Sequence, residues 1–254
     1  MSEPTLNQFV LSFDVDWAPD CAIDFVVDVL VEKQIKATWF VTHDSPGIER
    51  LFQHNNIFEL GIHPNFLPNS THGNSIKEVL THIAQLVPNS KIMRTHFLTQ
   101  STEILETSVS DFGIEIDVSL FLMGTPNIQP HLLFLNHDVK GLIRIPYFFE
   151  DDFEMFSPRK SWKINNGKYH VSGLKVFDFH PMYIYLNSDS MHKYRELKNL
   201  TPLHLLDCKA CEPFINRSIL GTKDLFIQLC EYIVNEQRMS YTLSDIVQLW
   251  KNKL

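Results

Sequence analysis

The sequence has no run of basic residues and no long apolar run. Its 254 residues include 22 Lys and Arg against 30 Asp and Glu, which gives a net charge of −8. A surface of this sign does not attract nucleic acid or an anionic membrane, so we expect neither as a partner. Because no run of about 18 apolar residues occurs, no membrane span is expected. The first residues lack the cationic start and apolar core of a signal peptide, so we expect a cytoplasmic protein.

Cysteine is also scarce, and the four cysteines form no recognisable site. Cys21 and Cys230 stand alone, whereas Cys208 and Cys211 form a single C-x-x-C. A structural zinc site needs a second pair of ligands, and a redox motif opens a helix after a strand early in the chain. Neither condition is met here, so we interpret the cysteines as incidental thiols.

What the chain does contain is an alternation of strands and helices. With 44% hydrophobic residues it can bury a full core, and without an internal repeat or a linker residues 1–254 are expected to form a single domain. Strands are expected at residues 9–13, 36–42, 58–62, 91–94, 113–118, 142–146 and 174–179, with 240–242 as a candidate for a last one. Helices are expected at 23–31, 46–54, 75–86, 101–112, 222–236 and 243–250. The alternation favours a parallel sheet wrapped by helices, and seven or eight strands predict an α/β barrel, closed or with a gap.

Two carboxylates end the first predicted strand. Reactive groups of parallel α/β folds collect at the C-terminal ends of the strands. Asp14 and Asp16 are two residues apart and point the same way, so one can hold a metal while the other stays free as a base. Acidic residues at an apolar strand end are costly unless they are used, which disfavours the alternative of a helix cap or a solvated turn.

Three further strand ends carry His63, His96 with Arg94, and His180. Neutral imidazole is a common metal ligand, although a lone histidine such as His63 is a satisfied core residue about half the time. Arg94 shares a face with His96 and would hold a neighbouring carboxylate ionised and oriented. An imidazole such as that of His180 can donate a proton to a leaving amine. Each position is a weak signal alone, but four of them in one chain indicate an active site.

At these residues the sequence resembles the polysaccharide deacetylase family, also called the NodB-homology family or carbohydrate esterase family 4. Residues 12–16 (Ser-Phe-Asp-Val-Asp) resemble its first motif with one residue inserted, and residues 37–41 (Ala-Thr-Trp-Phe-Val) resemble its next strand. Residues 177–180 (Phe-Asp-Phe-His) resemble its late Leu-x-His motif. More narrowly, the chain resembles the WbmS-like branch, found around O-antigen gene clusters, at residues 13–20, 41–46, 61–66, 145–152 and 176–181.

The resemblance implies a distorted (β/α) barrel of the NodB-homology type that hydrolyses an N-acetyl group on a sugar, releasing acetate and a free amine. It implies that Asp14 is the catalytic base, that Arg94 steadies this base and that His180 is the general acid. Asp16 and His63 would bind a divalent metal, for which zinc is favoured and manganese, cobalt, nickel or iron also fit. The substrate would be a small-molecule or carrier-linked acylated sugar, such as a nucleotide-linked or lipid-linked precursor.

One departure from the family pattern leaves the third metal ligand open. The family usually has His-x-x-x-His, but the residue four positions after His63 is Leu67. The candidates are His96, His72 and Asn65. We favour His96, because it follows a strand that is expected to neighbour the strand of His63, whereas His72 lies in an expected loop.

Several residues next to the motifs are candidates for contacts with the sugar, above all Trp17, Asn65, Tyr147 and Asp152, and also Phe66, Phe148 and Tyr183. Aromatic rings can stack on a sugar face, but packing inside the barrel is at least as common a role for each. Asp151 and Asp152 are candidates to replace the acid of the family's fourth motif, with Arg94 as the expected partner.

Three other functions stay open. The missing His-x-x-x-His motif suits a non-catalytic glycan-binding relative, although a pure binder needs neither Asp14 nor His180. A deformylase or another amidohydrolase acting on carbon–nitrogen bonds would use the same water attack. A haloacid-dehalogenase-like phosphatase also begins with Asp-x-Asp, but its pattern has Thr or Val where this chain has Ala18, and no basic residue is placed for phosphate.

Overall fold

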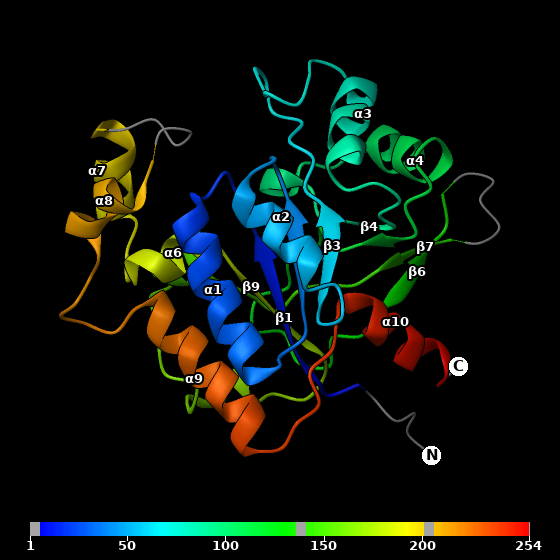
Figure 1. Ribbon diagram of the computed structural model, residues 1–254. Coiled ribbons are helices and arrows are strands. Elements are labelled where there is room, and N and C mark those ends of the chain that lie inside the picture. Colours follow the sequence, from blue (N-terminus) through cyan, green and yellow to red (C-terminus); the bar gives the residue numbers. More distant parts are fainter. Residues whose placement is uncertain (1–5, 136–140, 201–205, 254) are drawn as a thin grey trace.

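The computed structural model describes residues 6–135, 141–200 and 206–253. Within these ranges nine strands form one sheet in the order β6-β7-β5-β4-β3-β2-β1-β9-β8, and neighbouring strands are parallel except β6 with β7 (Figure 1). The strands are β1 (Phe9–Asp14), β2 (Ala37–Val41), β3 (Phe58–Ile62), β4 (Ile92–Met93), β5 (Ile116–Asp117), β6 (His131–Leu133), β7 (Leu142–Arg144), β8 (Phe149–Glu150) and β9 (Lys175–Phe179). Every residue of β1, β2 and β9 is buried, as expected for strands covered on both faces.

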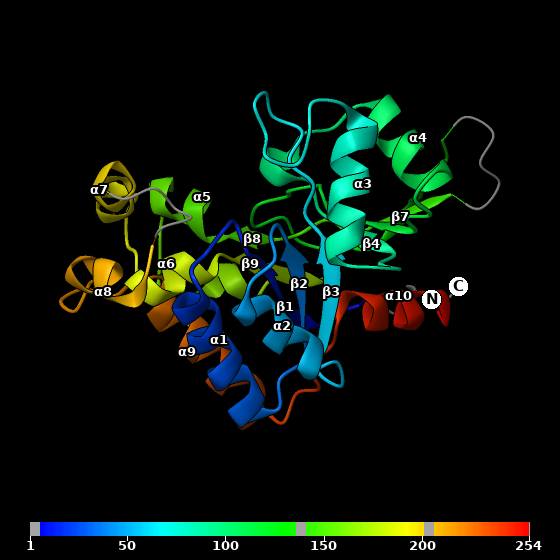
Figure 2. The ribbon, with the colours of Figure 1, turned by 45° about the horizontal axis from the view of Figure 1, so that its top comes forward.

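Helices surround this sheet. They are α1 (Asp20–Lys33), α2 (Pro46–Gln53), α3 (Ile76–Leu86), α4 (Thr102–Ser110), α5 (Asp151–Phe156), α6 (Pro181–Leu186), α7 (His192–Leu200), α8 (Cys208–Cys211), α9 (Thr222–Asn235) and α10 (Leu243–Lys251). α1 packs against α2, α6 and α9, and α3 packs against α4 (Figure 2). Ser75 caps α3, because its Oγ accepts a hydrogen bond from Glu78 N at 3.3 Å. None of the helices in the described ranges is long and apolar enough to cross a membrane.

The extended segment 142–150 brings the two ends of the sheet together. Its first half, β7, pairs with β5, and its second half, β8, pairs with β9. Between them, Tyr147 N donates to Leu120 O at 2.9 Å and Phe148 N donates to Val176 O at 2.8 Å. The expected distorted barrel is therefore confirmed. The strands exceed the expected seven or eight because this segment is divided in two and β6 adds an antiparallel edge.

The candidate strand at residues 240–242 is wrong. Thr242 is the N-cap of α10: its Oγ1 accepts a hydrogen bond from Asp245 N at 3.2 Å, and Asp245 Oδ2 accepts one from Thr242 N at 3.0 Å. Ser240 Oγ meanwhile accepts a hydrogen bond from Lys36 N at 2.9 Å, just before β2. The Thr-x-x-Asp spacing is a capping box, which predicts a helix start rather than a strand.

A glycine makes room inside the barrel below the strand ends. Asp14, Phe40 and Gly61 lie opposite one another on β1, β2 and β3 and share the inward face. His63 lies two residues beyond Gly61 and therefore projects to the same side. A Cβ at Gly61 would come within 2.7 Å of the Phe40 ring and 3.1 Å of Ile92 Cγ2. The glycine thus allows the Phe40 ring to lie across the interior.

We expect Gly61→Ala to lower the free energy of unfolding by about 1–3 kcal/mol, because the Phe40 ring must shift in a packed interior. Urea unfolding followed by circular dichroism measures the change. Gly167→Ala is the matched control, since a Cβ there meets nothing within 4 Å, and its effect should stay within about 0.5 kcal/mol. Equal stability of the two variants would contradict this view of the interior.

Candidate active site

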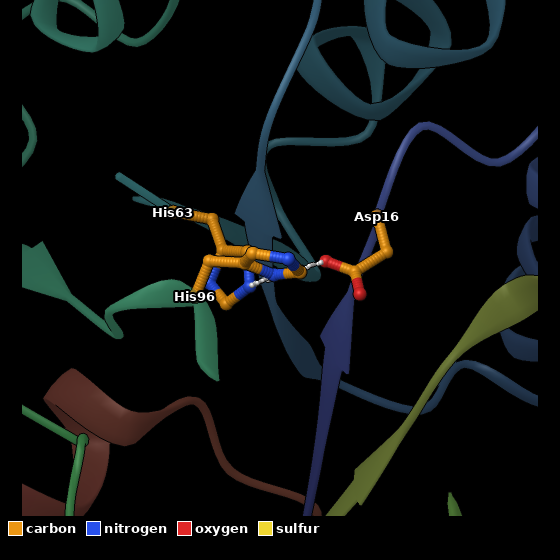
Figure 3. Close-up of side chains that lie close together, drawn as sticks. All are labelled: Asp16, His63 and His96. Carbon is orange, nitrogen blue, oxygen red and sulfur yellow. Dashed lines mark hydrogen bonds and ion pairs between the residues drawn. The ribbon is translucent and has the colours of Figure 1, made fainter. Parts of the chain in front are cut away.

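Three side chains from three different strand ends converge on one point. Asp16 follows β1, His63 follows β3 and His96 follows β4 (Figure 3). Asp16 Oδ1 lies 3.2 Å from His63 Nε2 and 3.1 Å from His96 Nδ1, and the two ring nitrogens are 3.3 Å apart. The chain leaves β1 through Asp16 (φ 47) and Trp17 (φ 55), which are both in the left-handed region that non-glycine residues rarely adopt. The strained turn directs the Asp16 carboxylate toward the two imidazoles.

A backbone contact sets which nitrogen of His63 faces the other two side chains. His63 Nδ1 lies 2.7 Å from the carbonyl oxygen of Arg94, which can only accept, so Nδ1 carries the hydrogen and Nε2 presents a lone pair. Burial would raise the pKa of Asp16, but the neighbouring His96, His63 and His180 outweigh it and hold this pKa well below its usual range. Asp16 is therefore an anion that faces imidazole nitrogens.

The donor set fits a divalent metal. Asp16 Oδ1 is buried and has no hydrogen-bond partner among the described residues. A carboxylate oxygen and an imidazole lone pair at this separation repel each other unless a cation lies between them. Nitrogen and oxygen ligands of a tetrahedral zinc ion, about 2.0–2.1 Å from the metal, lie about 3.3 Å from one another. The separations of 3.1–3.3 Å observed here match that spacing.

Asp14 is held by a buried arginine beside the three ligands. Arg94 Nη1 donates to Asp14 Oδ1 at 2.9 Å and also to Asp178 Oδ1, while Nη2 donates to Ser12 Oγ at 2.8 Å. The Arg94 side chain is 0% exposed. Burial would lower the pKa of Arg94, but the charges of Asp14 and Asp178 raise it, so the guanidinium stays charged. The other oxygen of Asp14, Oδ2, lies 3.5 Å from His63 Nε2, and Asp14 is one of the residues that line the cavity.

His180 has its own carboxylate partner. Asp151 Oδ1 lies 2.7 Å from His180 Nδ1, and Asp151 Oδ2 accepts a hydrogen bond from His180 N at 3.0 Å. Burial would lower the pKa of His180, but the Asp151 charge outweighs it and raises this pKa well above the usual value. His180 Nε2 points the other way, 3.6 Å from Asp16 Oδ2. The imidazole therefore presents its Nε2–H to the cavity while Asp151 orients the ring.

These groups line one open cavity with a volume of about 130 Å³. The lining residues are Asp14, Asp16, His63, Thr95, His96, Phe97, Leu98, Tyr147, Glu150, Asp152, Phe153 and His180. The structure thus brings together the expected base, acid and ligand candidates around a single space.

His72 and Asn65 do not join the ligand cluster. His72 Nδ1 accepts a hydrogen bond from Asn65 N at 3.1 Å, and His72 Nε2 lies 2.8 Å from the carbonyl oxygen of Thr42. Both ring nitrogens are therefore engaged by backbone groups, and burial lowers the pKa of His72 to about 4. The Asn65 side chain accepts a hydrogen bond from Leu67 N at 3.0 Å.

Among the expected sugar contacts, Asp152 and Tyr147 line the cavity, whereas Trp17 and Asn65 do not. The Trp17 ring packs against His96 with ring centroids 5.4 Å apart, so it supports a ligand candidate. The Tyr147 ring is stacked on Phe121, with centroids 4.7 Å apart, and covered on its other side by Arg94. No face of this ring is free for a sugar.

Four residues at the site were not predicted from the sequence, and one contact was assigned to the wrong partner. Asp178 holds Arg94, whereas Asp151, the expected partner of Arg94, holds His180. Glu150, Phe97 and Phe153 also line the cavity. A signal was present for Asp178, since an acid inside the apolar run Val-Phe-Asp-Phe must have a buried partner.

Removal of the Arg94 charge leaves two buried carboxylates without a counter-ion. We expect Arg94→Met to lower the free energy of unfolding by about 3–5 kcal/mol. Arg50→Met is the matched control, because Arg50 pairs with the exposed Asp24 and Asp28, and we expect an effect within about 1 kcal/mol. Urea unfolding checks both variants, and comparable losses would mean that Arg94 is not the buried counter-ion described.

Comparison with known proteins shows which family and which solved structures the chain resembles. Residues 11–198 match the family model "WbmS-like: Polysaccharide deacetylase", and no curated protein sequence matches the chain. Among solved structures, WbmS of Bordetella bronchiseptica, described as a "putative polysaccharide deacetylase involved in o-antigen biosynthesis", is 27% identical. It superposes with a TM-score of 0.78 over 90% of this chain and 91% of that chain.

Two more distant structures share the fold. The peptidoglycan deacetylase PdaC of Bacillus subtilis is 10% identical, with a TM-score of 0.52 over 100% of this chain and 95% of that chain. The family 4 acetyl xylan esterase of Clostridium thermocellum, whose structure holds a cobalt ion, is 12% identical, with a TM-score of 0.50 over 95% of this chain and 90% of that chain. Because the family model matches well over half of its residues, the chain belongs to the WbmS-like polysaccharide deacetylase family.

Proposed function

We propose that this protein is a metal-dependent hydrolase that removes the acetyl group from an N-acetylated sugar. The observation that carries the proposal is the meeting of three groups around one cavity. These are the convergent Asp16, His63 and His96, the base candidate Asp14 held by Arg94, and the acid candidate His180 oriented by Asp151. A non-catalytic binder has no use for a base and an acid that are each held by a separate buried partner.

In this proposal Asp16, His63 and His96 hold the metal, with zinc favoured and manganese, cobalt, nickel or iron as alternatives. The bound metal would polarise the acyl oxygen and lower the pKa of water at the site. Asp14 takes the proton from the attacking water, because Arg94 occupies its Oδ1 and leaves Oδ2 toward the cavity. His180 gives a proton from Nε2 to the departing nitrogen, and Asp151 stabilises the imidazolium. The products are acetate and a free amino sugar.

The similarity to WbmS supports a substrate that is a precursor of a surface polysaccharide. We propose an acylated sugar linked to a nucleotide or lipid carrier. The same water attack would serve a formyl group, so deformylation of a modified sugar is the alternative activity.

Metal content tests the ligand set. We expect near-stoichiometric metal in the purified protein and in His72→Ala, since both nitrogens of His72 are engaged by the backbone. His96→Ala should lose most of the metal, because it removes one of three converging ligands. Elemental analysis after dialysis, with circular dichroism to confirm folding, measures this. Metal lost from His72→Ala but kept in His96→Ala would reverse the assignment, and no metal in the unaltered protein even after soaking would favour a glycan-binding relative.

Release of acetate tests the acid and the base. On a panel of N-acetylated nucleotide sugars and lipid-linked sugars, we expect Asp14→Asn and His180→Gln each to lower kcat by about 10²–10⁴-fold while folding and metal content survive. Asp111→Asn on the surface is the control and should keep the activity. Ordinary turnover by Asp14→Asn would refute its role. Formate release from N-formyl sugars without acetate release would select the alternative activity.

A further inference from the structure

Two cysteines that are far apart in the sequence meet in the structure. Cys21 lies in the first turn of α1, and Cys208 is the first residue of α8. The thiol of Cys21 is hydrogen-bonded to the thiol of Cys208. All four cysteines of the chain are free thiols, and Cys208 is exposed. Their spacing in the sequence does not predict this contact, because it depends on the position of α8 beside α1 and α6 (Figure 1, Figure 2).

A third thiol and a phenol lie beside this pair. Cys211 ends α8 and is buried, and it is near enough to Cys21 for the two groups to interact electrostatically. The hydroxyl of Tyr185, on α6, is hydrogen-bonded to the Cys21 thiol. Burial raises the pKa of Cys21 to about 12 and that of Cys211 to about 11, and the neighbouring thiols add to both shifts. Because the thiolate is the reactive form, neither of these two groups attacks an oxidant readily near neutral pH.

Cys208 is the thiol of this cluster that an oxidant in solution can reach. Susceptibility to oxidation follows exposure, and an exposed cysteine beside a second, resolving cysteine is typical of a reversible redox pair. Its hydrogen-bond partner Cys21 is such a resolving thiol. Cys230 differs, because it is fully buried within α9 and its pKa is raised by burial.

We propose that Cys208 and Cys21 form a reversible disulfide when a peroxide oxidises the protein. The Cys208 thiolate attacks one oxygen of hydrogen peroxide, so that an S–O bond forms, the O–O bond breaks and hydroxide leaves. The Cys21 sulfur then attacks the Cys208 sulfur. The S–S bond forms, the S–O bond breaks, and the leaving hydroxide takes the Cys21 proton. The two thiols together lose two electrons and two protons, and one peroxide becomes two waters.

The disulfide would attach α8 to helices that begin at the proposed active site. α1 begins shortly after Asp16, and α6 begins directly after His180. The contact between Cys21 and Tyr185 already joins these two helices, and the disulfide would add α8 to them. Residues 11–198 match the family model, so Cys208 lies outside the matched segment. The inference concerns only the thiols and is independent of metal binding and of hydrolysis.

Mass spectrometry after mild oxidation tests the pairing. The reduced, folded protein is treated with a few equivalents of hydrogen peroxide, the remaining thiols are blocked with N-ethylmaleimide, and the protein is digested without reductant. We expect two of the four thiols to be lost, a peptide linked through Cys21 and Cys208, and recovery of all four thiols with dithiothreitol. Because a cross-link restricts the unfolded chain, the midpoint of urea unfolding should rise on oxidation.

Cys230→Ser is the matched control and should keep both the linked peptide and the rise in the urea midpoint. Cys21→Ser should lose both, with Cys208 trapped as a sulfenic acid by dimedone. Cys208→Ser, at an exposed position, should leave the other three thiols reduced. A disulfide between Cys208 and Cys211, a disulfide between two chains, four thiols that stay reduced, or an equal rise in the urea midpoint of Cys21→Ser would overturn the inference.

Discussion

The site depends on one buried cation, the guanidinium of Arg94. Its side chain holds Asp14 and Ser12 on β1 and Asp178 on the neighbouring β9. Its guanidinium also lies over the rings of Phe40 and Tyr147. Two buried acids with one arginine leave an excess negative charge inside the barrel, and burial raises the pKa of Asp178 well above its usual value. The same guanidinium therefore offsets the buried negative charge and orients Asp14.

The backbone of Arg94 extends its influence to the ligand candidates. Its carbonyl oxygen accepts from His63 Nδ1 and thereby sets which nitrogen of His63 is free, while its side chain sets the position of Asp14. A single residue at the end of β4 thus relates the base candidate to the metal site. Displacement of this strand end would move Asp14 and change the contact of His63 together. The Phe40 ring packs on Arg94 and supports its position, and Gly61 leaves the space for this ring.

The sequence was sufficient to locate the strand ends and therefore most of the site. Asp14, Asp16, His63, His96 and His180 all follow apolar runs, and parallel strands bring such positions to one edge. It favoured His96 over His72 from the expected order of the strands, but it could not predict the loop contacts by which the Thr42 carbonyl and the Asn65 amide engage the ring of His72. The sequence also did not predict that Asp151 pairs with His180 or that residues 142–150 form two strands, because both features depend on how the sheet closes into a barrel.

The absence of the family's His-x-x-x-His spacing changes how the proposed metal site is held. Two histidines one helical turn apart would be aligned by local structure alone. Here the second imidazole comes from the segment after β4, and His96 N donates to Pro64 O at 3.0 Å to place that segment against the end of β3. The three candidate ligands therefore belong to three strands and depend on the spacing of the sheet. Such a set is as rigid as the barrel itself, which is what a metal site requires of its supporting structure.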